Sequence, residues 1–198
     1  RIRFDGDGYS EAWEKEAAKR KLSNNKNTPQ ALEVLTSKKT VSLFEEVGVM
    51  SEIEITARQE VEYETYILQT QIEGRILNEL VFSHILPAAF RYQQTLSNGV
   101  LALKQLYGND SDTASESRLN ILDQLNTHLN GARQRTEAMV QARREANLLE
   151  DPKEKAVAYC QQVKPFFEEI RHHCDRLERI IEDEDWPLVK YRELLFFK

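Results

Sequence analysis

The stretch AVAYCQQVKPFFEEIRHHCDRLERII, residues 156–181, decides the fold class. Its seam residues recur at steps of four or three, a spacing that places them on one side of an α-helix and is typical of helical bundles. They are Ala156, Cys160, Val163, Phe167, Ile170, Cys174, Leu177 and Ile181. Asp151 and Pro152 supply a cap and a first-turn proline. We therefore expect a helix over residues 151–181, slightly bent at Pro165.

Two more long helical patterns precede this one. The first begins at Ser51, where Glu54 three positions on completes a capping box, and runs to about Tyr107 with a kink at Pro87. Its seam after the kink is Phe82, Leu86, Ala89, Gln93, Leu96, Val100, Leu103 and Tyr107, polar only at Gln93. The second pattern covers residues 116–146, with a seam of Leu122, Leu125, Leu129, Ala132, Thr136 and Met139.

Three amphipathic helices joined by short connections bury their seams by packing against one another. The sequence therefore predicts an all-α fold, an antiparallel up-down bundle of three long helices, one of them kinked, behind a short helical lead-in. We expect two domains: residues 1–50 as the lead-in, with an extended start and short helices, and residues 51–198 as the bundle with a docked C-terminal tail.

The lead-in is expected to begin with the end of a strand, residues 1–4, whose partner strands are not in this chain. Short helices are predicted at residues 10–21, 30–35 and 38–47; Thr28 caps the second and Gly48 ends the third. At the other end, the apolar residues of segment 191–197 predict docking on the bundle or on a neighbouring subunit. The acidic run 182–185 opposes the helix dipole, so we expect it to fray or to meet cations elsewhere.

The composition excludes several classes of function. The net charge of −6 and the pI near 5.4 argue against nucleic acid or an anionic membrane as the partner. No stretch approaches the roughly 20 apolar residues of a membrane span, and no secretory signal appears. Cys160 and Cys174, 14 residues apart on one expected helix, lie too far apart for a disulfide, which predicts thiols in a reducing cytoplasm. The start at Arg1 favours a piece of a longer protein.

Four patterns could carry chemistry, and each has a structural interpretation that we favour. Residues 5–8, DGDG, begin like a calcium loop but lack its later ligands, so they predict a turn. Adjacent helical residues diverge by about 100°, so the motif His172, His173 and Cys174 cannot converge on one ion unaided. Glu169 with His172 supplies only one of the two Glu-x-x-His pairs of a four-helix metalloprotein. The locally basic set, read as a solvated helix face, is Arg133, Arg135, Arg143 and Arg144.

No serine, cysteine or lysine lies in a recognisable nucleophile setting, and the sequence has no glycine-rich phosphate loop. We therefore assign no catalytic, cofactor-binding or metal-binding residue to this chain. From the residues alone, the sequence predicts a scaffold or interaction module.

Several segments together resemble the C-terminal part of the type III glutamine synthetases. At the start these are RFDGDGYS (3–10), Trp13, KRKL (19–22), Asn25 and TPQAL (28–32). In the middle they are Arg58, Glu60, Glu62, Ile72-Glu73, Leu86-Pro87 and Lys164-Pro165, and at the end Trp186-Pro187 and YRELLF (191–196). The resemblance covers nearly the whole chain; its two ends are specific and its helical middle is generic. Lys21 departs from the pattern, which has glycine there.

The resemblance implies a parent enzyme that joins ammonia to glutamate through a γ-glutamyl phosphate, using ATP and Mg²⁺ or Mn²⁺. In that family the catalytic residues lie on an upstream sheet, and no residue of this chain matches their motifs, so this fragment is expected to hold no cofactor. The implied partners are the upstream catalytic domain and further copies of the chain in a ring assembly, with no nucleic acid and no membrane. The alternative is a stand-alone helical-bundle interaction module without enzymatic activity.

Overall fold

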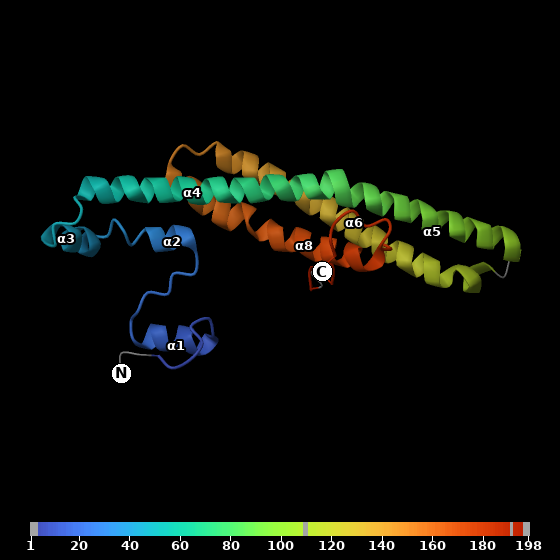
Figure 1. The fold of residues 1–198 in the computed structure, drawn as a ribbon, viewed down its shortest axis with the longest axis horizontal. Coiled ribbons are helices and arrows are strands. Elements are labelled where there is room, and N and C mark those ends of the chain that lie inside the picture. Colours follow the sequence, from blue (N-terminus) through green and yellow to red (C-terminus); the bar gives the residue numbers. More distant parts are fainter. Residues whose placement is uncertain (1–3, 109–110, 191, 196–198) are drawn as a thin grey trace. The chain divides into compact units, whose positions relative to one another are not determined.

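In the computed structural model, residues 4–108, 111–190 and 192–195 are described, with nothing said of the side chains of residues 111 and 112. Every element in these ranges is helical, so the predicted all-α class is confirmed (Figure 1). The chain forms two compact units, Arg1–Tyr66 and Ile67–Lys198, and the long helix α4 (Glu52–Glu79) runs from one into the other. The domain division after residue 50 stays a prediction. Most of the predicted strand end, residues 1–4, falls outside the described residues.

The first unit holds the predicted short helices. They are α1 (Glu11–Lys19), α2 (Thr28–Leu32) and α3 (Lys38–Glu46). Ser10 caps α1. The prediction that Thr28 caps α2 was wrong, because the side chain of Asn27 accepts the hydrogen bond from the Gln30 amide at 3.0 Å. Asparagine is among the strongest N-cap residues, and Thr28 becomes the first helical residue.

Helix α1 ends in a Schellman motif whose left-handed residue is Lys21. The Leu22 amide donates to the Ala17 carbonyl at 2.9 Å, and the Lys21 amide donates to the Ala18 carbonyl at 3.1 Å. The φ of Lys21 is 57°, a region that favours glycine. Position 21 is the one at which the sequence departs from the expected glycine. Helix α3 ends in the same motif, with Gly48 at φ 67°.

The start of α4 holds α2 in place. The capping box of Ser51 and Glu54 is present, with the Ser51 amide donating to the Glu54 carboxylate at 2.8 Å. Further along, the Gln59 side-chain amide donates to the Leu32 carbonyl at 2.7 Å, and the hydroxyl of buried Tyr63 donates to the Pro29 carbonyl at 3.4 Å. By contrast, α3 contributes no buried residue to this unit.

The second unit consists of long helical arms, each proline-containing arm interrupted by a π-helical segment. The elements that follow α4 are η1 (Leu80–Ile85), α5 (Leu86–Tyr107), α6 (Ser111–Asn147), α7 (Pro152–Ala158), η3 (Tyr159–Val163) and α8 (Pro165–Ile180). The sequence predicted continuous α-helix through both prolines. Proline lacks the amide hydrogen and clashes with the carbonyl four residues back, and a wider π turn just before Pro87 and Pro165 relieves that clash. Helix α6 begins five residues before the predicted start.

The seams form the core of this unit. Helix α6 packs against α5, α8 and η3. The buried seam residues include Leu125, Leu129, Ala132, Met139, Val163, Ile170 and Leu177. The seam's polar members are satisfied: Gln93 donates to the Asn126 side-chain carbonyl at 2.6 Å, and Thr136 donates to the Ala132 carbonyl at 2.7 Å. Phe82 and Tyr107, predicted to lie in the seam, are exposed.

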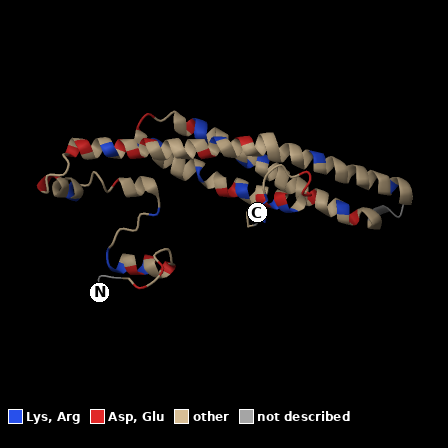
Figure 2. Cartoon of the chain, viewed as in Figure 1, with Lys and Arg blue, Asp and Glu red and all other residues tan. Residues whose placement is uncertain are grey.

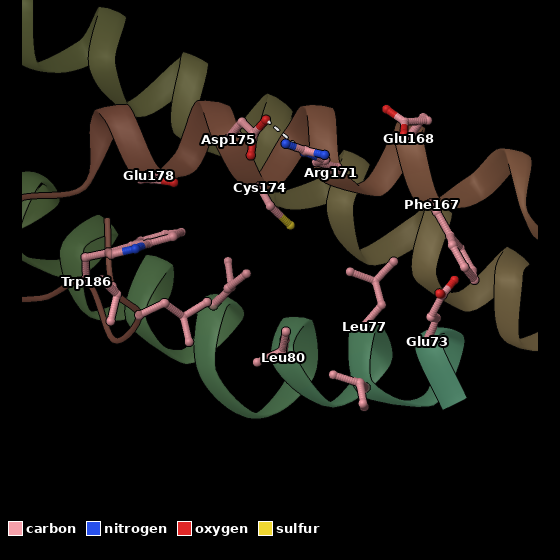
Figure 3. Close-up of a pocket in the computed structure, with 14 residues that line it drawn as sticks. Glu73, Leu77, Leu80, Phe167, Glu168, Arg171, Cys174, Asp175, Glu178 and Trp186 are labelled. Atoms are coloured by element: carbon pink, nitrogen blue, oxygen red, sulfur yellow. Dashed lines mark ion pairs between the residues drawn. The ribbon is translucent and has the colours of Figure 1, made fainter. Parts of the chain in front are cut away.

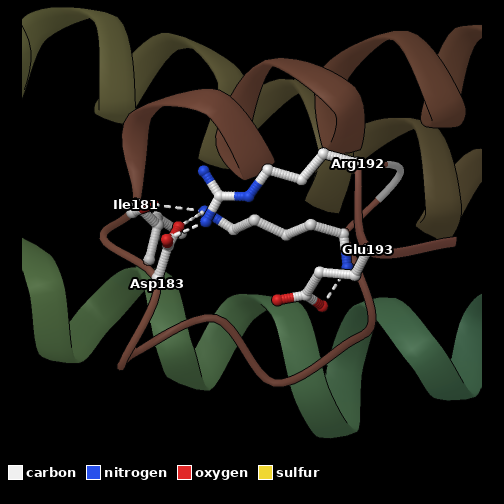
Figure 4. Close-up of polar contacts among 5 residues, drawn as sticks. Ile181, Asp183, Arg192 and Glu193 are labelled. Atoms are coloured by element: carbon white, nitrogen blue, oxygen red, sulfur yellow. Dashed lines mark hydrogen bonds and ion pairs between the residues drawn. The ribbon is translucent and has the colours of Figure 1, made fainter. Parts of the chain in front are cut away.

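The chain after α8 is fixed by a buried lysine. Lys190 is 8% exposed, and its amino group donates to the Ile181 carbonyl at 3.1 Å and to the Asp183 carboxylate at 2.6 Å (Figure 4). Arg192 pairs with the same carboxylate. The acidic run therefore meets cations, one of the two expected outcomes. Leu194 and Leu195, in the short 3₁₀ turn η4 (Glu193–Leu195), are exposed, and Phe196 and Phe197 lie outside the described residues.

Candidate functional site

The second unit contains an open apolar groove of about 660 Å³. The end of α4 and η1 form one wall, α8 forms the other, and the segment after α8 closes one end (Figure 3). Its apolar lining comprises Ile76, Leu77, Leu80, Ile85, Phe167, Cys174, Trp186, Leu188 and Val189. A volume of this size falls within the range of ligand-binding sites in proteins.

The rim of the groove is acidic. Four carboxylates line it, from Glu73, Glu168, Asp175 and Glu178, against one guanidinium from Arg171. Arg171 pairs with Asp175 at 3.7 Å along α8 (Figure 3). The rim therefore favours a cationic group on whatever enters the groove.

Two polar groups of the groove are shielded from solvent, Cys174 in part and the Nε1 atom of Trp186 fully. Cys174 directs its sulfur toward the groove (Figure 3), and burial, with a smaller contribution from Asp175, raises the pKa of its thiol to about 12. A thiol with so high a pKa stays protonated and is a poor nucleophile or metal ligand. The Nε1 atom of Trp186 is buried without a hydrogen-bond partner among the described residues, an arrangement that costs free energy.

The motif His172, His173 and Cys174 divides between two faces of α8, as helical geometry requires. The two histidines meet His128 of α6 instead, with ring centroids of His173 and His128 5.4 Å apart and those of His172 and His128 6.0 Å apart. The Nδ1 atoms of His128 and His173 lie 3.1 Å apart, within hydrogen-bonding distance. Sequence reasoning missed His128, because 45 residues separate it from His173 in the chain.

Glycine allows this close approach. A Cβ atom at Gly131, one turn from His128 on α6, would lie closer than 3.0 Å to three ring atoms of His173. Burial lowers the pKa of both His128 and His173, and neighbouring positive groups lower it further. Both shifts favour the neutral form of the imidazoles.

Most of the other candidate groups make ordinary structural contacts, but the Nη1 atom of Arg143 is buried without a hydrogen-bond partner among the described residues. Arg133 pairs with Glu137 at 2.8 Å and Arg135 with Glu169 at 3.0 Å, so Glu169 is not paired with His172 as a metal site would require. Figure 2 shows Lys and Arg interspersed with Asp and Glu along the helices. Asp7 of the DGDG segment accepts from the Tyr9 amide at 2.9 Å, as in a turn. Across the described ranges, no group of three or more His, Cys, Asp or Glu side chains could hold a metal ion.

Comparison with known proteins decides the family. A sequence model described as the glutamine synthetase C-terminal domain matches residues 1–104, more than half of the chain. The chain belongs to this family. A glutamine synthetase of Bacteroides fragilis (strain YCH46) is 40% identical over the whole chain, which covers 27% of that protein. The type-3 glutamine synthetase of Dictyostelium discoideum is 31% identical over 203 aligned residues, again all of this chain and 27% of the relative.

A glutamine synthetase of Butyrivibrio fibrisolvens is 26% identical over 196 residues, 99% of this chain and 28% of that protein. The predicted resemblance to the C-terminal part of type III glutamine synthetases is thus confirmed. This glutamine synthetase domain spans only about a quarter of the length of the curated relatives that it matches. None of its described helices has the length and apolar character needed to cross a membrane.

Proposed function

We propose that this chain is the non-catalytic, C-terminal helical part of a type III glutamine synthetase, with a structural or assembly role. The observation that carries the proposal is the 40% identity along the entire chain to a protein named glutamine synthetase, of which it covers 27%. The parent would join ammonia to glutamate at the expense of ATP, a ligase reaction of nitrogen assimilation. Such a chain would act in the cytoplasm, in keeping with its two free cysteines.

The chemistry of the parent would take place outside this chain. ATP-dependent ligation requires a divalent metal held by several carboxylates, and the described residues bring no such cluster together. We therefore propose that the reaction takes place on residues outside this chain. ATP and Mg²⁺ or Mn²⁺ would bind to the upstream catalytic domain.

An assembly role is supported by apolar side chains that the chain itself does not cover. Helix α3 has no buried residue, and exposed apolar side chains lie in it and in the segment that follows it. They are Leu43, Val47, Val49 and Ile53. Apolar patches of this kind are typical of protein contacts. The partner that covers them would be the upstream catalytic domain or a second subunit of a ring assembly. In the second unit, we infer that the long arms form an antiparallel three-helix bundle with α6 between the other two.

The assembly role can be tested with Leu43→Glu and Val47→Glu together in the longer synthetase that we propose carries this chain. Leu101→Glu with Leu106→Glu is the matched control, since both leucines are exposed on α5. Mass photometry should show smaller particles for the α3 variant and unchanged particles for the control. Unchanged assembly of the α3 variant would count against a role for α3 in subunit contacts.

A further inference from the structure

The groove continues into an apolar stripe along the outside of α4. Leu68, Ile72 and Ile76 are 57%, 47% and 51% exposed, and they follow one another at steps of four residues. Leu80, a further four residues on, lines the groove together with Ile76. Residues at this spacing share one face of a helix, over roughly 18 Å of its length. The apolar surface is thus elongated, which suits another helix better than a compact small molecule.

The carboxylates on the rim of the groove indicate that a helix bound there carries positive charge. Glu73 and Glu168 lie at one end of the groove and Glu178 toward the other (Figure 3). An apolar stripe between carboxylates matches a helix whose apolar face is flanked by lysine or arginine. A second copy of this chain, with a net charge of −6, would bring like charge instead.

Trp186 extends the apolar lining of the groove at one end. It lines the end of the groove, is 8% exposed, and its Nε1 has no hydrogen-bond partner among the described residues. The ring therefore adds apolar surface to this end of the groove, whereas its Nε1 atom is too deeply buried for a docked helix to reach.

We infer that the groove and the stripe together form one binding surface, with Leu68 at one end and Val189 at the other. This surface binds an amphipathic helix with basic flanks that belongs to a separate polypeptide. The groove helices α4 and α8 both lie in the second unit, so this site is distinct from the exposed residues of α3 invoked for assembly. If the α3 variants assemble normally, the inference about the groove is unaffected. If no peptide binds the groove, the family assignment and the proposed assembly role are unaffected.

The test uses a fluorescently labelled peptide of about 18 residues, long enough to match the stripe, with leucine on one face and lysine on the other. Binding to the longer synthetase is followed by fluorescence anisotropy. A peptide with glutamate in place of lysine and one with scrambled order are the peptide controls. We expect the lysine peptide to bind at least about tenfold more tightly than either control.

Two pairs of variants locate the site. Ile76→Asp should weaken binding about tenfold, because it places a carboxylate in the apolar contact, whereas Leu101→Asp, at a similarly exposed residue of α5, should have no effect. Glu73→Lys should weaken binding about threefold to tenfold, whereas Glu116→Lys makes the same charge change on α6 and should not. All four side chains are exposed, so the variants should fold; circular dichroism checks this.

Three results would overturn the inference. One is equal binding of the lysine and glutamate peptides. Another is binding that Ile76→Asp and Glu73→Lys leave unchanged, which would mean non-specific attraction to an acidic protein. The third is binding to the isolated chain but not to the longer synthetase, which would mean that another part of the parent, or a second copy, covers the groove.

Discussion

The Nδ1 atoms of His128 on α6 and His173 on α8 lie 3.1 Å apart. A hydrogen bond between two imidazole nitrogens needs one of them to be unprotonated. Burial is the main cause that lowers the pKa of both rings. His172 lowers both further, Arg176 acts on His128 and Arg135 on His173, while Glu169 opposes the shift at His173. Two helices are thus joined through a contact that requires at least one of the two histidines to be neutral.

The first prediction concerns the stability of the chain at acidic pH. Since the folded-state pKa of His128 and His173 lies below the ordinary 6.5, the unfolded chain binds more protons in the interval between the two values. The contribution of these histidines to stability is therefore complete at neutral pH and is lost as the pH falls through 6.5.

Urea unfolding at pH 7.5 and pH 5.5 should show a smaller difference in midpoint for His128→Gln/His173→Gln than for the natural chain. His84→Gln is the control, because His84 is exposed on η1; a histidine pair variant with the full pH dependence would contradict the account.

The second prediction concerns the close approach at Gly131. Alanine there would push against the His173 ring, so Gly131→Ala should lower the free energy of unfolding by about 1–3 kcal/mol. Gly74→Ala is the matched control on α4, where a Cβ would meet Phe167 and Met139 at 3.6–3.8 Å, an ordinary contact. That substitution should raise stability by about 0.5–1 kcal/mol, the usual gain within a helix. Similar effects of the two substitutions in urea unfolding would rule out the tight contact.

The third prediction concerns the end of α1. Lys21 has a φ of 57°, so Lys21→Gly should stabilise the chain by about 1 kcal/mol through relief of left-handed strain. Gly48→Ala, at the same position of the motif that ends α3, should destabilise it by about 1 kcal/mol. Thermal unfolding followed by circular dichroism measures both. A lower melting temperature for Lys21→Gly would contradict the assigned motif.

The fourth prediction concerns the segment that follows α8. Lys190→Met removes two hydrogen bonds of a buried ammonium and should cost about 1–3 kcal/mol. Arg192→Met removes an exposed ion pair with the same Asp183 and should cost less than about 1 kcal/mol. In a Trp13→Phe background, the emission of buried Trp186 should shift to the red only in the Lys190 variant. Equal effects of both substitutions would show that Lys190 does not hold this segment.

Much of the fold could be predicted from the sequence, because the helices are indicated by patterns local in the sequence. The seam of residues 156–181 predicted helix and placed Ile170 and Leu177 in the core correctly, since a 3.6-residue period is visible without tertiary information. The π segments could not be predicted, because proline predicts a disruption but not how the backbone absorbs it. The cap of α2 was misplaced by one residue, since Asn27 and Thr28 are both good caps.

The candidate sites were less predictable. His172 and His173 were visible as a motif, but their partner His128 comes from a helix whose rotation and register are set by packing. The groove depends on Trp186 and Val189 lying beside α4, a contact distant in sequence. A hint was present: Leu68, Ile72, Ile76 and Leu80 follow a four-residue spacing that belongs to no predicted seam. An apolar face left over after the core is assigned is the pattern that could have revealed it.

The central claim is that this chain is part of a glutamine synthetase but holds no complete active site of its own. The most direct test incubates the purified 198-residue chain with glutamate, ammonia, ATP and Mg²⁺ or Mn²⁺, and measures glutamine formation beside the longer synthetase. Circular dichroism must first show that the chain is helical. The account predicts glutamine formation by the longer protein and none by the helical chain alone. Turnover by the chain alone would contradict it.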